Sequence, residues 1–249
     1  MVKTSSQAKT DGPVEMIVPD STADHTWRGH SPGEKSKYLQ MSIDHLDLLF
    51  GHFASTADPG GYRVHLLAVW KDKHTTPSHH RRVFCQNYGG VEQAKSHLPA
   101  VFNLNQAGYD IYVCVAPLQP FPDDGDEVGG RTKADVLCSV ACHVEVDITD
   151  EMSADSLEEI IKQSPVAPTF QVVSGPTGGR HLYFVLEEPS TDFDRVEAVS
   201  QGLRDYFNAK DAVHDVTRCL RLAGTLNQKP DYQDQPPFRS FLIGEEIGQ

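Results

Sequence analysis

The stretch Ala-Cys-His-Val-Glu-Val-Asp-Ile, residues 141–148, is the most informative segment of this 249-residue chain. In a β-strand the side chains alternate between two faces, so one face here is wholly apolar and the other carries His143, Glu145 and Asp147. Two carboxylates two residues apart on one face repel each other unless a cation lies between them. The segment therefore predicts a divalent-metal site; the alternative is a solvated strand face that ends in an acidic loop.

Glycines dominate the next polar segment, Ser-Gly-Pro-Thr-Gly-Gly-Arg-His, residues 174–181, which leaves one apolar run and enters another. Glycine permits positive φ and a close approach of backbone N–H groups to an anion. The side chains of Ser174, Arg180 and His181 can reach phosphate oxygens. We interpret the segment as a phosphate-binding turn, against the alternative of a plain hairpin with a surface histidine. A Walker A loop is excluded because Gly-Lys-Ser/Thr is missing.

A third polar segment, Asp-Val-Thr-Arg-Cys-Leu-Arg, covers residues 215–221. If it is a short turn or helix, as we expect around 216–222, Arg218 and Arg221 lie one turn apart and can clamp a phosphate. The alternatives are surface salt bridges for the arginines and a helix N-cap role for Asp215. Together the three segments supply carboxylates, a phosphate turn and cations, a combination that favours nucleotidyl transfer.

Composition and charge limit the possible domain organisation, partners and location of the protein. Residues 1–36 are polar and lack periodicity, so we expect a disordered or extended arm followed by a catalytic domain over 37–249, with lobes at roughly 37–140 and 141–249. The net charge of −13 argues against non-specific coating of nucleic acid. It does not exclude an enzyme with a local basic track, such as His74–Arg82. Five cysteines, an odd count, and the lack of an apolar stretch of about 20 residues indicate a cytoplasmic protein.

Periodicity predicts an alternation of helices and strands. Helices are expected over 37–53, 91–103, 154–163 and 191–208. Strands are expected over 62–70, 82–86, 109–115, 142–148, 168–174, 181–187 and 237–243. A hairpin-length loop joins the strands at 168–174 and 181–187, so a mixed or antiparallel sheet fits better than a doubly wound parallel one.

These segments resemble the three motifs of the archaeo-eukaryotic primase superfamily, in its primase-polymerase branch of phages, plasmids and mobile elements. The first motif, two acids separated by one residue at the end of an apolar strand, is matched by Glu145 and Asp147. The second, Ser-x-His or a glycine-rich form of it, is matched by residues 174–181. The third, an acid before Leu-Arg-Leu-Pro-Gly-Thr-x-Asn-x-Lys, is matched by residues 215–229, with Ala223 in place of the proline.

The resemblance covers roughly residues 60–245 and implies a fold, a cofactor and a set of roles. The fold is an α/β (α+β) archaeo-eukaryotic primase fold, in which an N-terminal αβ module packs against an RRM-like module around a mixed or antiparallel sheet. The implied ligands of two Mg²⁺ or Mn²⁺ ions are Glu145, Asp147 and Asp215. The implied triphosphate contacts are Ser174, Gly179, Arg180 and His181, with Arg221 and Lys229 as further phosphate contacts. His181 is also implied in catalysis, stabilising charge on the leaving pyrophosphate.

The expected function is a DNA-template-dependent nucleotidyltransferase that synthesises primers and extends them, with attack of a 3′-hydroxyl on an NTP or dNTP and release of pyrophosphate. Its expected partners are single-stranded DNA template, primer and a fused or separate helicase, in a prokaryotic, phage or mobile-element setting and without a membrane. One alternative is a metal-dependent nuclease with the same acidic triad, which leaves the phosphate turn unused. The other is a non-catalytic RRM-like nucleic-acid-binding module, in which three acids would repel the nucleic acid.

Overall fold

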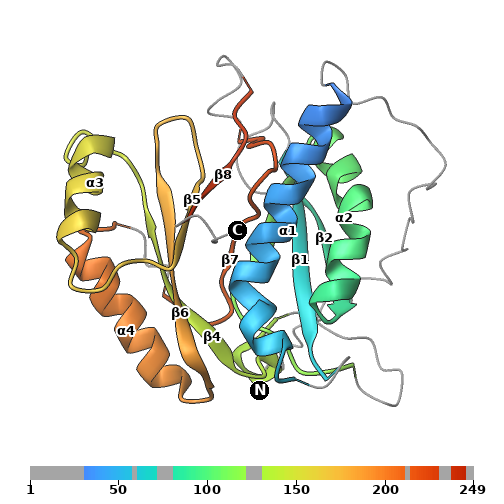
Figure 1. Ribbon diagram of the computed structural model, residues 1–249, viewed down its shortest axis with the longest axis horizontal. Helices are drawn as coiled ribbons and strands as arrows, with labels where there is room; N and C mark the ends of the chain where they lie inside the picture. Colours follow the sequence, from blue (N-terminus) through green and yellow to red (C-terminus); the bar gives the residue numbers. More distant parts are fainter. Residues whose placement is uncertain are drawn as a thin grey trace, which may run out of the picture.

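The computed structural model describes residues 31–57, 61–71, 81–121, 131–210, 214–229 and 237–244. Within them, two four-stranded antiparallel sheets lie beside each other, with helices packed on both sides (Figure 1). The first sheet has the order β2 (Arg81–Gly89), β1 (Arg63–Lys71), β3 (Asp110–Cys114), β7 (Cys219–Arg221). The second has the order β4 (Ser139–Val146), β6 (Arg180–Ser190), β5 (Phe170–Val173), β8 (Phe241–Gly244).

The first helix, α1 (Pro32–Ala54), begins five residues before the predicted start at residue 37. Ser31 and Glu34 form a capping box, in which each side chain accepts a hydrogen bond from the other residue's backbone N–H. Pro32 at the first helical position has a φ suited to the helix. The predicted arm over 1–36 thus ends in a capped helical turn, and its first 30 residues lie outside the described part of the chain.

One core joins the two sheets through α1. Leu46, Leu49 and Phe50 of this helix are buried in a cluster that includes Val64 of the first sheet and Phe170 of the second. The second helix, α2 (Val91–Gln106), covers the first sheet beside α1 (Figure 1). Since both sheets bury side chains against the same helix, their relative position is set by packing.

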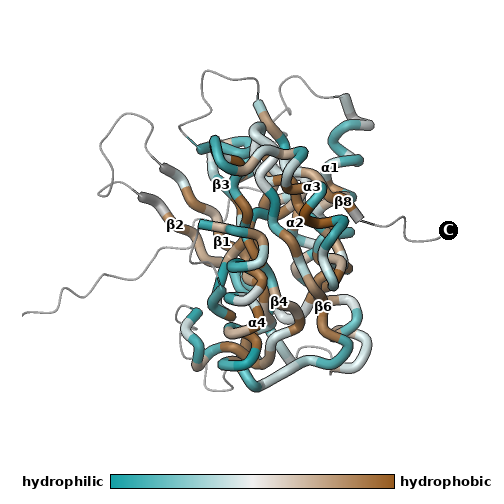
Figure 2. Tube along the Cα trace, turned by 90° about the vertical axis from the view of Figure 1, so that its left-hand side faces the viewer, coloured by the Kyte–Doolittle hydropathy of each residue, from teal (hydrophilic) through white to brown (hydrophobic). Residues whose placement is uncertain are grey.

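A second core fills the outer side of the second sheet, where α3 (Ala154–Gln163) and α4 (Phe193–Tyr206) lie (Figure 1). Val144 and Val146 of β4 point into this core, as the alternation predicted, together with Leu157 of α3 and Val196 of α4. Figure 2 shows the apolar residues concentrated in the strands and the polar ones along the outer surfaces. The polar face of β4 is therefore turned toward the first sheet.

The predicted turn or helix around 216–222 is wrong in its second half. Residues 219–221 form β7, which pairs antiparallel with β3 at the edge of the first sheet. The pairing supplies backbone hydrogen bonds that a short isolated helix could not match, so tertiary context overrides the local pattern. A strand from the second half of the sequence consequently completes the sheet of the first half. Among the described helices, none combines the length and apolarity required to cross a bilayer.

Candidate active site

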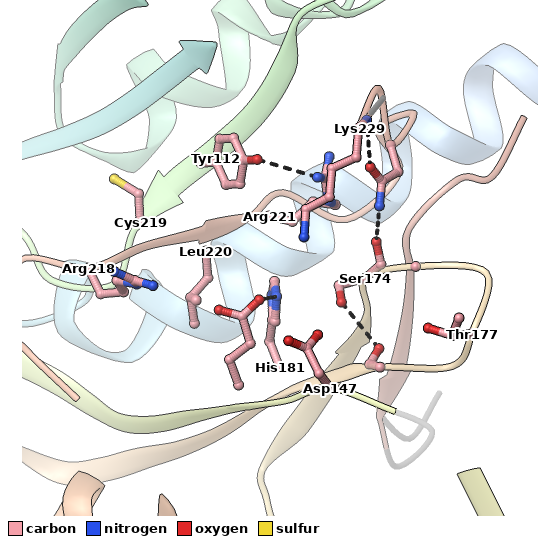
Figure 3. A pocket seen from close by; sticks show the side chains of 14 residues that line it. Tyr112, Asp147, Ser174, Thr177, His181, Arg218, Cys219, Leu220, Arg221 and Lys229 are labelled. Atoms are coloured by element: carbon pink, nitrogen blue, oxygen red, sulfur yellow. Dashed lines mark hydrogen bonds and ion pairs between the residues drawn. The ribbon is translucent and has the colours of Figure 1, made fainter. Parts of the chain in front are cut away.

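A polar cavity of about 190 Å³ lies between the two sheets (Figure 3). Segments from both sheets and from the loops after β5 and β7 contribute to its wall. The sequence-predicted residues that line it are Glu145, Asp147, Ser174, Gly179, His181, Arg218, Arg221 and Lys229. Its other lining residues are Tyr112, Gly175, Thr177, Cys219, Leu220 and Asn227. Residues separated by more than 80 positions in the sequence thus meet at one place.

Glu145 and His181 face each other on neighbouring antiparallel strands, β4 and β6. The Glu145 Oε1 atom lies 3.3 Å from His181 Nε2, and only 16% and 3% of the two side chains are exposed. Burial opposes ionisation of Glu145, but the hydrogen bond and charge of His181, with the charges of Lys229 and Arg218, outweigh it and lower its pKa to about 2. Glu145 is therefore a carboxylate at neutral pH. His181 Nδ1 is buried and has no hydrogen-bond partner among the described residues.

Asp147 follows the last residue of β4, is exposed, and lies at the cavity (Figure 3), which Glu145 also lines. Beside it lies Gly179. A Cβ atom at Gly179 would be 3.3 Å from the Val146 carbonyl oxygen, 3.5 Å from Asp147 Oδ1 and 3.6 Å from Ser174 Oγ. A Cβ atom would crowd the Val146 carbonyl and touch the other two oxygens, so the glycine keeps space open next to the carboxylate.

The glycine-rich segment is a tight turn between β5 and β6. The Ser174 N–H donates to the Gly179 carbonyl at 2.9 Å, and the Gly178 N–H donates to Gly175 at 3.0 Å. Gly178 has φ +91°, a conformation that favours glycine. The Ser174 hydroxyl donates to the Gly179 carbonyl at 3.3 Å. The turn is thus held by its own backbone and borders the cavity along one side.

Arg180 does not line the cavity. Its guanidinium lies 2.5 Å from Glu158 Oε1, donates to Gln171 Oε1 at 2.9 Å and, through Nε, to the Gly178 carbonyl at 3.3 Å. Because adjacent residues of a strand point to opposite faces, Arg180 and His181 diverge. Arg180 therefore stabilises the turn through the Gly178 carbonyl, from outside the cavity.

Arg221 reaches the cavity wall, but its charge is already paired. Nη1 donates to Asp110 Oδ1 at 2.6 Å, with both side chains 2% exposed. The guanidinium also lies 5.1 Å from the centre of the Tyr112 ring, and Nη2 donates to its hydroxyl at 3.4 Å (Figure 3). The cations whose charge lowers the pKa of Glu145 are Lys229 and Arg218, the residue that immediately precedes β7.

Asp215 lies in a second cavity, of about 380 Å³, and not in the first. Tyr112, Arg218 and Cys219 border both cavities, and the second is completed by Leu67, Arg131, Asp215 and Thr217. Asp215 Oδ1 accepts a hydrogen bond of 2.6 Å from the Thr217 hydroxyl. Within the part of the chain that the structure describes, no three His, Cys, Asp or Glu side chains are grouped closely enough to hold one metal ion. Asp215 therefore lines one cavity and the pair Glu145 and Asp147 lines the other, and the two cavities share Arg218 and Cys219 as wall residues.

Of the expected basic track His74–Arg82, residues 74–80 lie outside the described residues. Arg131 donates to the Thr217 carbonyl in the second cavity, while Lys133 pairs with Asp194 and Glu197 at 2.8 and 2.9 Å. Sequence reasoning missed Tyr112 and Asn227 as wall residues. Alternation in the strand 109–115 could have indicated Tyr112, because Ile111 and Val113 occupy the apolar face.

Comparison with solved structures identifies the fold. The AEP (archaeo-eukaryotic primase) domain of the cyanophage S-2L primase-polymerase superposes with a TM-score of 0.54 at 17% identity, over 82% of this chain and 89% of that one. The primase RepB′ superposes with a TM-score of 0.51 at 14% identity, over 81% of this chain and 56% of that one. No family model and no curated protein matches the sequence. The expected α+β fold, with its antiparallel sheets, is confirmed.

Proposed function

We propose that this chain, which has the archaeo-eukaryotic primase fold, is a DNA-template-dependent nucleotidyltransferase that synthesises primers and extends them. The observation that supports the proposal most strongly is the cavity between the sheets, where two carboxylates, Glu145 and Asp147, lie with the cations Arg218 and Lys229 and a glycine-rich turn. Carboxylates alone would repel a triphosphate, and cations alone would not hold a divalent ion. A cavity that contains both carboxylates and cations suits a nucleotide that binds together with a divalent metal ion.

The residues fit a divalent cation of the hard type. Carboxylate oxygens are the ligands that Mg²⁺ and Mn²⁺ prefer, and Mg²⁺ is commonly bound by one or two carboxylates with substrate phosphates and water. Glu145 and Asp147 supply such a pair, and Gly179 leaves room beside Asp147. Asp215 borders the adjoining cavity, so we propose it as a third ligand that acts from that side. When bound, two such ions would neutralise the triphosphate and lower the pKa of the attacking 3′-hydroxyl.

The chain's own residues have separate tasks in this proposal. Lys229, Arg218 and His181 would contact phosphate oxygens and stabilise the charge that grows on the departing pyrophosphate. The turn 174–179 orients the triphosphate along the cavity wall. Arg221 supports the wall through its pair with Asp110, and we no longer propose Arg180 as a phosphate contact. The expected substrates are an NTP or dNTP, a primer and a single-stranded DNA template.

The decisive experiment measures synthesis. The full chain is incubated with unprimed or primed single-stranded DNA, Mg²⁺ or Mn²⁺ and labelled NTPs or dNTPs, and the products are sized. We expect products longer than a dinucleotide that disappear with EDTA and with Asp147→Asn, while the matched surface variant Asp150→Asn remains active. Shortening of labelled DNA without nucleotides would instead indicate a nuclease. DNA binding without synthesis in either metal would indicate a non-catalytic module.

A further inference from the structure

Two cysteines are directly opposed on neighbouring strands beside the candidate active site. Cys114, the last residue of β3, pairs in register with Cys219, the first residue of β7. The Val115 N–H donates to the Arg218 carbonyl at 2.9 Å, and the Leu222 N–H donates to the Ile111 carbonyl at 3.0 Å. These bonds alternate along the ladder, so Cys114 and Cys219 occupy a non-hydrogen-bonded position, where opposed Cα atoms lie about 4.5 Å apart.

That separation falls within the range of about 4.4–6.8 Å that a disulfide spans. In an antiparallel pair, opposed side chains also point to the same face of the sheet. Both thiols are free, and each shifts the pKa of the other. The backbone therefore needs no rearrangement for a bond between the sulfurs.

The two thiols differ in access and in acidity. Cys114 is 0% exposed, whereas Cys219 borders both cavities and can be reached by a small reagent from there. The neighbouring Cys219 thiol lowers the pKa of the Cys114 thiol, and burial raises the pKa of the Cys219 thiol. Access therefore decides the order: Cys219 meets the external oxidant first, at a rate limited by its small thiolate fraction, and the more acidic Cys114 completes the reaction.

We propose that Cys114 and Cys219 are a modification site that closes to a reversible disulfide by exchange with a small disulfide oxidant. In the first step Cys219 loses its proton and attacks the oxidant, forming a mixed disulfide and releasing one equivalent of thiol. In the second step the Cys114 thiolate attacks the Cys219 sulfur and expels the second equivalent. Two protein thiols are thus oxidised and one oxidant molecule is reduced to two thiols.

The bond would join β7, a three-residue edge strand, to the interior of the first sheet. Arg218 immediately precedes the bonded residue and Arg221 follows two positions later, so the link would fix the strand that borders both cavities. The closed loop contains on the order of 100 residues, a length for which cross-linking restricts the unfolded chain strongly. This inference does not depend on the proposed function.

The test uses the purified full chain, incubated at pH 8.5 with 2-hydroxyethyl disulfide, quenched with acid, alkylated under denaturing conditions and digested. Mass spectrometry should find the Cys114 and Cys219 peptides joined and short of two hydrogens, and dithiothreitol should separate them. The oxidised protein should unfold at a temperature roughly 5–10 °C higher than the reduced protein. Because this readout uses unmodified sequence, it does not require that any variant fold.

Matched variants then identify the partners. Cys85, exposed on β2, is the competing thiol. The Cys85→Ser variant should form the same cross-link at the wild-type rate, and Cys219→Ser should abolish it. If Cys114 and Cys219 are recovered as alkylated, unlinked peptides after full exposure to the oxidant, the proposal is wrong. A cross-link that contains Cys85 in place of Cys114 would overturn it equally.

Discussion

Glu145 and His181 are opposed across β4 and β6, and their side chains meet at 3.3 Å with little exposure to solvent. Each side chain therefore restricts the other: the carboxylate accepts from the imidazole, and both residues line the cavity. This pairing links a proposed metal ligand to a proposed phosphate contact. A change at one of them should alter the behaviour of the other.

Removal of the His181 ring should weaken nucleotide binding more than it slows the chemical step. We expect His181→Ala to raise the KM for the nucleotide at least tenfold, since it deletes a phosphate contact and leaves Glu145 without its partner. Steady-state incorporation on a primed template gives KM and kcat separately. His97→Ala, on the exposed face of α2, serves as the control and should leave both unchanged. An unaltered KM for His181→Ala would remove this residue from the phosphate site.

The space beside Gly179 provides a second test. In Gly179→Ala the new Cβ would meet the Val146 carbonyl at 3.3 Å and Asp147 Oδ1 at 3.5 Å. The Val146 carbonyl must then shift by a few tenths of an ångström and the methyl group occupies the space beside the carboxylate, so we expect a loss of roughly tenfold or more in kcat/KM. Gly202→Ala is the matched control, because nothing lies within 4 Å of its Cβ; within α4 it should raise stability by about 0.5–1 kcal/mol. Full activity of Gly179→Ala would show that the pocket beside Asp147 is not used.

Asn227 connects two parts of the cavity wall. Its Nδ2 donates to the Ser174 carbonyl at 2.8 Å, and its Oδ1 accepts from the Lys229 N–H at 3.0 Å. We expect Asn227→Asp to raise the nucleotide KM about tenfold with a smaller change in kcat, because the carboxylate cannot donate to Ser174 and the turn loses its support. Binding of a labelled nucleotide, measured without DNA, checks the same effect independently of synthesis. Equal losses in kcat and kcat/KM would contradict a positioning role.

Much of the fold was predictable because the chain alternates apolar residues with regular periods. Helix 154–163 matches the observed α3 at both ends, since a Ser153 cap and a hydrophobic period mark it clearly. The same reasoning failed at 216–222. A three-residue strand such as β7 has no period of its own, and its pairing with β3 is decided by residues more than 100 positions away.

For the candidate site, local alternation predicted which faces Glu145 and His181 occupy but not what lies opposite them. The pair became visible only in the register of β4 with β6. Arg180 illustrates the limit: its place in a glycine-rich turn suggested a phosphate contact, yet Glu158, from a helix earlier in the chain, pairs with it on the other face. Partners contributed by distant segments cannot be deduced from spacing along one segment.

The buried pair of Arg221 and Asp110 predicts a large effect on stability. Breaking a buried ion pair leaves an uncompensated charge, so Asp110→Ala and Arg221→Ala should each lower the free energy of unfolding by about 3–5 kcal/mol. The double variant should lose much less than the sum. Urea titrations of the four proteins measure this coupling. Additive losses would mean that the two side chains are not coupled. A raised nucleotide KM at unchanged stability in Arg221→Ala would instead favour a direct phosphate contact.

The buried His45 should make the free energy of unfolding depend on pH. Burial in α1, with a smaller contribution from the charge of His181, lowers its pKa from 6.5 to about 3. The unfolded chain therefore binds a proton below pH 6.5 that the folded protein does not bind until about pH 3. Stability from this group is complete above pH 6.5 and is lost as the pH falls, by about 1.4 kcal/mol between pH 7.5 and 5.5.

The substitution His45→Gln isolates that contribution. Burial also lowers the pKa of His143, to about 4, and that of His65, so the wild-type protein should lose more than a single histidine accounts for. Urea unfolding at both pH values should show a loss about 1.4 kcal/mol smaller in His45→Gln than in wild type. Between pH 7.5 and 8.5 the two slopes should coincide, because the unfolded imidazole is already neutral there. An identical acid-side loss in the two proteins would mean that His45 takes up its proton without unfolding.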